Sequence, residues 1–169
     1  MNNILDQKVI SRVRRNHGLE HATMHILGNR FPTIGFAGIS DPGGFWIFGN
    51  VELDDLSAAV VDALSRLRAG EHNLAIHPNC GTNFVTTGVI AGFAAWLAML
   101  GLKKGFKEKL DRLPQVITLT TLAIMVSQPL GNKLQARVTT DGNPGNLELS
   151  GIQVFERAGM LTYRINTKG

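Results

Sequence analysis

The sequence contains a single cysteine, Cys80, among its 169 residues. One cysteine cannot form an internal disulfide, which excludes the disulfide scaffolds of small secreted domains and favours a reducing compartment. The N-terminus also lacks the basic start, the long apolar core and the small-residue cleavage site of a secretory signal. We therefore expect any membrane insertion to use internal segments. Internal repeats and low-complexity segments are missing as well.

Charged residues are missing from residues 84–102. At a rise of about 1.5 Å per residue, such a helix spans roughly 28 Å, close to the thickness of the hydrocarbon core of a bilayer. A second uncharged run, residues 113–130, is shorter and more polar. Together they predict a transmembrane helical hairpin, in which Gly88 and Gly92 at GxxxG spacing would allow close packing. The alternative is two buried helices of a soluble core, since the mean hydropathy is only +0.05.

Basic residues outnumber acidic ones, which gives a net charge of +4 and a pI near 9.6. Much of the excess lies between the two apolar runs, where it would face anionic lipid headgroups: Lys103, Lys104, Lys107, Lys109 and Arg112. A further basic stripe, formed by Lys8, Arg12 and Arg15, is expected to face lipid or solvent. We therefore predict that these basic residues face a lipid bilayer and that the protein binds no nucleic acid.

The orientation of the hairpin is ambiguous from charge alone. The positive-inside rule places its basic loop in the cytoplasm, but this would require export of the arginine-containing N-terminal part. Both ends of a hairpin emerge on the same side of the membrane. We expect the N-terminal and C-terminal parts to lie together on the cytoplasmic side.

The remaining sequence predicts a small mixed domain. Helical periodicity runs over residues 5–27 and stops at Gly28-Asn29, and a short amphipathic helix covers residues 54–67. Alternating or β-branched segments predict strands, with turns at residues 40–44 and 157–159: residues 33–39, 45–51, 74–76, 134–140, 147–155 and 160–165. The fold class is therefore α+β, with the transmembrane hairpin inserted before the C-terminal strands. We expect an N-terminal α+β domain, the hairpin, and a C-terminal β segment that packs on the first domain: residues 1–82, 83–131 and 132–169.

The sequence HGLEH, from His17 to His21, has the form H-x-x-E-H. At about 100° per residue on a helix, His21 lies about 40° from His17 and Glu20 about 60° to the other side, so the three groups share one face. Two imidazoles there could chelate an ion, with the carboxylate as a base or further ligand. The alternative is a pair of hydrogen-bonded core histidines, with Glu20 paired to Arg14 or Arg15.

A second cluster, HPNCGT, places His77 and Cys80 three positions apart in a turn rich in proline and glycine. This spacing suits a two-point metal chelate, although a turn with a small buried thiol is the alternative. The two clusters together offer four candidate ligands, with Glu20 and His25 nearby: His17, His21, His77 and Cys80.

The blocks HGLEH, HPNCGTNF and PLGNKLQARVTT resemble, in the same order, motifs of the YqhQ-like bacterial membrane proteins. The resemblance covers roughly residues 14–140 in three short blocks, and a glycine-rich N-terminal block of that family is missing here. The segment between the first two motifs is also longer, so a shorter sister family is expected. The resemblance implies one shared, metal-dependent site with five members: His17, Glu20, His21, His77 and Cys80.

These features predict a membrane-anchored, metal-dependent hydrolase of peptides, amides or esters. Zinc, or another divalent transition metal, would be bound by His17, His21 and either His77 or Cys80, with Glu20 as general base. If all four ligands bind, the ion is coordinatively closed and structural. The alternative function is then a non-catalytic membrane accessory or assembly protein. A haem protein is disfavoured because the C-x-x-C-H motif is missing. The prediction leaves open the substrate, a membrane-protein partner and oligomerisation.

Overall fold

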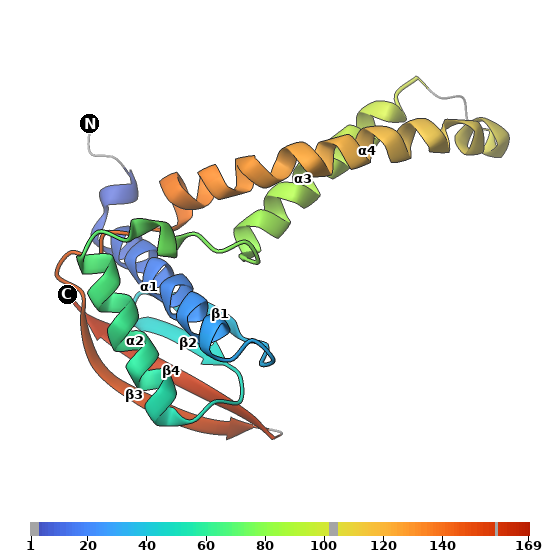
Figure 1. The fold of residues 1–169 in the computed structure, drawn as a ribbon. Helices are drawn as coiled ribbons and strands as arrows, with labels where there is room; N and C mark the ends of the chain where they lie inside the picture. Colours follow the sequence, from blue (N-terminus) through green and yellow to red (C-terminus); the bar gives the residue numbers. More distant parts are fainter. Residues whose placement is uncertain (1–3, 102–104, 158) are drawn as a thin grey trace. The chain divides into compact units, whose positions relative to one another are not determined.

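The computed structural model of the chain describes residues 4–101, 105–157 and 159–169. The chain divides into an α+β unit, residues 1–77 with 136–169, and a helical hairpin unit, residues 78–135. Within the described residues, four α-helices accompany a four-stranded antiparallel sheet, which confirms the α+β class (Figure 1). The predicted loop residues Lys103 and Lys104 and the turn residue Ala158 lie outside the described residues.

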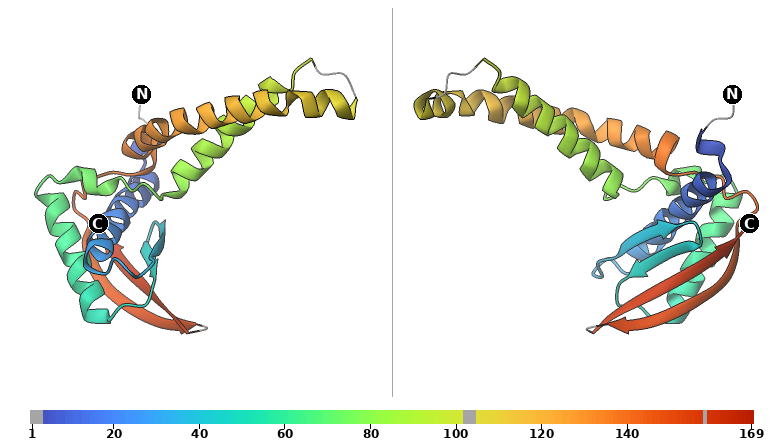
Figure 2. Two further views of the ribbon diagram at one scale, coloured as in Figure 1. Left: turned by 45° about the vertical axis from the view of Figure 1, so that its right-hand side comes forward. Right: turned by 180° about the vertical axis from the view of Figure 1, so that it is seen from behind.

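The α+β unit packs two helices on one face of a sheet (Figures 1 and 2). The helices are α1 (Lys8–Arg30) and α2 (Leu53–Arg68), and they contact each other. The strands follow the order β1 (Ala37–Asp41), β2 (Gly44–Phe48), β4 (Met160–Lys168) and β3 (Glu148–Arg157), with every neighbouring pair antiparallel. The central pair, β2 and β4, joins the N-terminal and C-terminal parts of the chain.

The two central strands, β2 and β4, place every second residue in the hydrophobic core. Phe45, Ile47, Tyr163 and Ile165 are buried on the face that the helices cover. The apolar stripe of α2 packs onto them: Leu56, Ala59, Val60, Ala63, Leu64 and Leu67. Because strand residues alternate between faces, the four buried strand residues all lie on the side of the sheet that faces the helices. The helices are thereby fixed on the sheet, and α1 carries the HGLEH motif.

Three elements of the α+β unit differ from the prediction. Helix α1 continues through Gly28 to Arg30, because a glycine inside a long helix costs only about 1 kcal/mol. The first hairpin turns at residues 42–43, and its strands are shorter than predicted because residues 33–36 and 49–51 lie outside them. Residues 72–75 form a 3-10 turn, η2 (His72–Ala75), where a strand is predicted at 74–76. Its N–H groups bond locally, with Leu74 N donating to Glu71 O at 3.1 Å.

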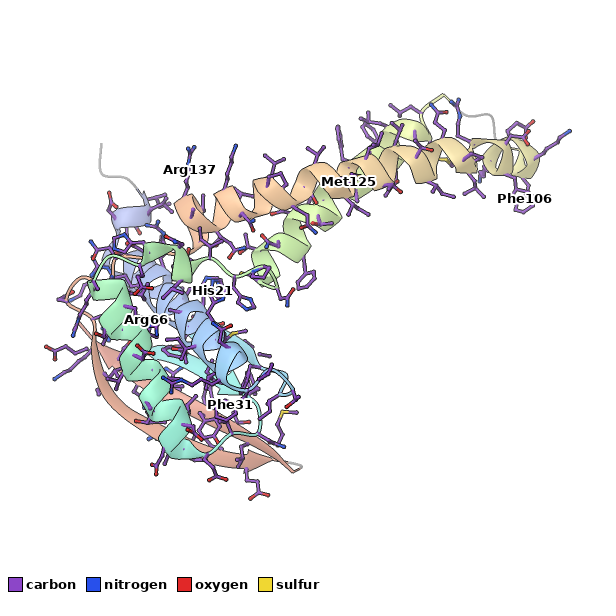
Figure 3. The ribbon with its side chains drawn as sticks, in the orientation of Figure 1. His21, Phe31, Arg66, Phe106, Met125 and Arg137 are labelled. Carbon is purple, nitrogen blue, oxygen red and sulfur yellow. The ribbon has the colours of Figure 1, made fainter. Side chains whose placement is uncertain are left out.

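The helical hairpin unit consists of α3 (Gly81–Ala98) and α4 (Phe106–Leu134). Each helix is long and apolar enough to cross a membrane by length and composition. Figure 3 shows side chains projecting from the outer surface of the pair, and many of the exposed ones are large and apolar: Phe84, Val85, Val89, Phe93, Ile117, Leu122, Met125 and Val126. Helix α4 begins before the predicted apolar run, so Lys107, Lys109 and Arg112 lie in its first turns and not in a loop.

Polar contacts join the two helices of the hairpin unit. Thr87 Oγ1 and Ser127 Oγ lie 2.8 Å apart, and Gln135 Nε2 donates to Asn83 Oδ1 at 2.7 Å. Gly131 allows this approach, since a Cβ there would lie 3.2 Å from the Cα of Asn83. The prediction that Gly88 and Gly92 mediate close packing is wrong: among the described residues, a Cβ at either position would meet open space.

A π-helix, Gln135–Thr139, directly follows α4, and this contradicts the strand predicted at residues 134–140. The alternation of Leu134, Ala136 and Val138 with polar residues imitates a strand. Helical hydrogen bonding nevertheless continues from α4 through these residues, because no neighbouring strand pairs with them in the four-stranded sheet. Single π-helical turns occur often at functional sites.

Candidate metal-binding site

Four histidines of the α+β unit form one continuous cluster. His17, His21 and His25 follow at four-residue spacing along α1, so they share one side of the helix. The ring centroids of His17 and His21 lie 4.4 Å apart. The ring of His77 lies 5.6 Å from that of His21 and 4.8 Å from that of His25. The course of the chain after η2 therefore brings His77 to the histidine side of α1.

Backbone carbonyls hold three of these rings. His21 Nδ1 lies 2.7 Å from Ala75 O, and His17 Nδ1 lies 2.9 Å from Thr139 O. His25 uses the other nitrogen, with Nε2 2.8 Å from the carbonyl oxygen of residue 76. Because a carbonyl only accepts, each of these nitrogens carries the proton in the neutral ring. The lone pair is then on Nε2 of His17 and His21, and a ring oriented in this way is typical of metal ligands.

Burial lowers the pKa of His77 to about 4, and the neighbouring His25 and His21 contribute in the same direction. Burial disfavours the charged imidazolium, and positive charge on either neighbour would repel it. His77 is therefore neutral at pH 7. The neutral imidazole is the form that binds metal ions.

Glu20 is a buried carboxylate that faces β1 and is 3% exposed. The hydroxyl of Ser40 donates a hydrogen bond to Glu20 Oε2. Gly38, two residues earlier on the strand, leaves room for the carboxylate, since a Cβ there would collide with it. Residues two apart on a strand face the same way. Strand β1 thus provides a donor and a gap for one acidic side chain.

The glycine of HGLEH is required for close packing. A Cβ on Gly18 would collide with the carbonyl oxygen of Asp141 and would lie 3.3 Å from Ala75 Cβ. The segment at Asp141 and the end of η2 therefore both approach α1 beside the histidines. These are the two segments whose carbonyls hold His17 and His21.

Arg14 fastens the first of these segments to α1. Its guanidinium donates to Thr140 O at 3.1 Å and to Arg137 O at 3.2 Å, while Asp141 N donates to the carbonyl of Arg14 at 2.9 Å. Arginine can serve several carbonyls because its planar group carries five N–H donors. These contacts position Thr139, between the two bonded carbonyls, to accept from His17.

Cys80 belongs to the helical hairpin unit, where it is the N-cap of α3. Its Sγ accepts from Thr82 N at 3.4 Å. Only two residues separate it from His77 along the chain, so connectivity keeps the two Cα atoms within about 11 Å. Imidazole and thiolate are ligand types that zinc prefers.

The structure adds two side chains, His25 and Ser40, and several backbone groups to the five predicted site residues. His25 joins the cluster through His77, and its four-residue spacing from His21 is the sequence signal that points to it. Ser40, the donor to Glu20, carries no such signal because β1 is distant from α1 in sequence. The backbone carbonyls that accept from the histidines have no sequence signal either, because every residue has a backbone carbonyl.

Comparisons with known proteins return a family without an assigned function. The family described as "Domain of unknown function (DUF6391)" matches residues 12–152. An uncharacterised protein of Picosynechococcus sp. (strain ATCC 27264 / PCC 7002 / PR-6) is 39% identical over 154 residues, covering 83% of this chain and 71% of that protein. No solved structure matches this chain. The YqhQ-like resemblance remains a similarity of motifs.

Proposed function

This chain belongs to the DUF6391 family, whose function is unknown, and we propose that it is a membrane-anchored, metal-dependent hydrolase. The observation that carries the proposal is the cluster of His17, His21 and His77, in which backbone carbonyls set the orientation of the first two rings. The similarity of the HGLEH and HPNCGTNF blocks to the YqhQ-like motifs adds support, because it implies a shared site of the same residues.

The donor set fits a divalent transition metal, with zinc as the simplest choice. Neutral imidazoles and a thiolate are typical zinc ligands, whereas calcium and magnesium prefer oxygen ligands. His17, His21 and either His77 or Cys80 would hold the ion. Three protein ligands leave one coordination position for substrate or water, and zinc bound in this way supplies Lewis acidity.

Glu20 would act as the general base. It follows His17 by three residues on the same helix, as in the inverted H-x-x-E-H arrangement of zinc proteases. The Ser40 hydroxyl orients one carboxylate oxygen, which limits rotation of the group. An oriented, buried carboxylate can take a proton from an attacking water and return it to the leaving group. Hydrolysis of a peptide, amide or ester bond is the simplest reaction of this kind.

The helical hairpin unit would anchor the chain in a lipid bilayer. Both helices have the necessary length and hydropathy, and their outer surface exposes apolar side chains that lipid would solvate better than water. The α+β unit would lie on the cytoplasmic side. Retention of the protein in the membrane pellet after an alkaline carbonate wash tests the anchor. Release into the supernatant would contradict it.

A membrane accessory protein with a structural metal is the second candidate. The specific observation is that only two residues separate Cys80 from His77, so Cys80 is available as a fourth ligand. Four protein ligands close a zinc site to substrate. The metal would then fasten α1 to the chain segment that enters α3, and Glu20 would have no catalytic role.

The test compares wild type with Glu20→Gln, both reconstituted in nanodiscs and assayed for metal content and for hydrolysis of fluorogenic peptide, amide and ester probes. We expect Glu20→Gln to retain the metal and to lose about 10²-fold to 10⁴-fold in turnover. The control is Glu148→Gln, which removes an exposed carboxylate on β3. Metal-loaded wild type that hydrolyses no probe faster than Glu20→Gln would overturn the enzymatic proposal in favour of the structural one.

A further inference from the structure

A cavity of about 240 Å³ lies at the start of α1, inside the α+β unit. None of the four clustered histidines lines it. The polar part of its wall contains three cationic side chains, one hydroxyl, one amide and one carboxylate: Lys8, Arg12, Arg15, Ser11, Asn146 and Asp6. A single water occupies about 30 Å³ of liquid, so the cavity has room for a small polyatomic ion.

Protein contacts hold both arginines in place. Arg12 Nη2 donates to Thr167 O at 2.6 Å, and Arg15 Nη1 donates to Asn146 Oδ1 at 3.2 Å. The Nε atoms of both side chains are buried and have no hydrogen-bond partner in the described part of the chain. Each guanidinium has five N–H donors, so each has donors in excess of these protein contacts. The cavity wall therefore contains two positioned guanidinium groups, those of Arg12 and Arg15, whose N–H donors are only partly used by protein contacts.

The N-terminus of α1 adds to the positive potential of this cavity. The helix begins at Lys8, and its N-cap residue Gln7 makes no side-chain capping bond. The first N–H groups of a helix lack intrahelical partners, and the helix dipole gives this end a partial positive charge. Three cationic side chains line this cavity, against the single acidic side chain of Asp6. The balance of charge favours an anion.

We propose that this cavity binds a phosphate group. Paired arginines beside a helix N-terminus match the shape and charge of phosphate, since a guanidinium donates two parallel hydrogen bonds to its oxygens. The phosphate can come from the headgroup of an anionic lipid or from a soluble phosphate. Both sources share the chemistry that Lys8, Arg12 and Arg15 recognise.

Two measurements on the full chain separate the sources. The first is calorimetric titration of inorganic phosphate into the protein in phosphatidylcholine nanodiscs. The second is native mass spectrometry of the protein offered phosphatidylglycerol or phosphatidylcholine. Saturable binding of inorganic phosphate supports a soluble ligand. Selective retention of phosphatidylglycerol supports a lipid headgroup.

The variants are Arg15→Gln and Lys8→Gln, which each remove one charge from the cavity wall. We expect each to weaken binding about ten-fold, because each removes a charge-assisted hydrogen bond. Arg66→Gln is the matched control, since Arg66 lies on α2 and pairs with Asp62 at 2.9 Å outside the cavity. Lys8 is exposed at the helix start, so its replacement tests the site even if Arg15→Gln misfolds.

Two results would overturn the proposal. One is that neither inorganic phosphate nor phosphatidylglycerol binds to wild type above the phosphatidylcholine background. The other is that Lys8→Gln and Arg15→Gln bind as tightly as Arg66→Gln.

Discussion

The Nδ1 atom of His21 donates to the carbonyl oxygen of Ala75 at 2.7 Å, across 54 positions of the chain. This bond ties the middle of α1 to the segment that carries His77. Thr139 makes the same kind of contact with His17 from the C-terminal part of the chain. Two segments outside α1 therefore orient the rings, and helical spacing alone does not explain the cluster.

Gly18→Ala is expected to destabilise the α+β unit by about 1–3 kcal/mol, because its Cβ would collide with the backbone carbonyl of Asp141. The collision would also displace the segment that presents Thr139 to His17. Thermal unfolding followed by circular dichroism measures the loss of stability.

Gly28→Ala is the matched control on the same helix. A Cβ at Gly28 meets open space among the described residues, so alanine there should stabilise the helix by about 0.5–1 kcal/mol. Equal stability of Gly18→Ala and wild type would contradict the packing role of Gly18.

The Asp41–Arg164 ion pair predicts an acid-dependent loss of stability. Arg164 donates to both oxygens of Asp41, at 2.7 Å and 2.8 Å, and its hydrogen bond is the main cause that lowers the pKa of Asp41. A carboxyl whose pKa is lowered by folding stabilises the fold above its unfolded pKa of about 3.9. That contribution disappears as the pH falls through the lower, folded value.

Unfolding midpoints measured between pH 7 and pH 2 test this dependence. Below about pH 4, wild type should lose more stability than Asp41→Asn, which lacks the titrating group. The difference should be modest, because the side chain of Asp41 is 41% exposed and solvent screens the pair. Parallel curves for the two proteins below pH 4 would show that the pair contributes nothing.

Gln135→Leu should weaken the association of α3 with α4. Gln135 is fully buried and donates to Asn83 across the hairpin unit. Hydrogen bonds between membrane helices contribute about 1 kcal/mol, so a loss of this size is expected in SDS-titration unfolding followed by tryptophan fluorescence. Gln128→Leu makes the same chemical change at an exposed position of α4 and should cause no loss. Equal stability of the two variants would contradict a specific role for Gln135.

Local patterns predicted what depends on local geometry. The side that His17 and His21 share follows from helical periodicity, and the alternation in β2 and the length of α3 follow from equally local rules. The turn between β3 and β4 falls partly outside the described residues, but the two strands pair as an antiparallel hairpin.

The prediction was wrong where two conformations share a pattern. Residues 134–140 alternate like a strand, but α4 continues through them because pairing with a neighbouring strand is not available. Gly88 and Gly92 have the spacing of a helix interface, but spacing does not say which side of α3 faces α4. The long-range contacts of Glu20 with Ser40, and of His21 with Ala75, depend on the tertiary fold and leave no trace in local sequence.

Metal content tests the proposed site most directly. The measurement is mass spectrometry of metals on protein purified under reducing conditions without a metal-affinity column, for wild type, His21→Ala and His17→Ala. His72→Ala is the control, since His72 is exposed and lies outside the ring contacts of the cluster. We predict about one zinc or other divalent transition-metal ion per chain in wild type and His72→Ala, and its loss in the other two variants. Wild type without stoichiometric metal, or His21→Ala and His17→Ala with as much metal as wild type, would contradict the proposed site.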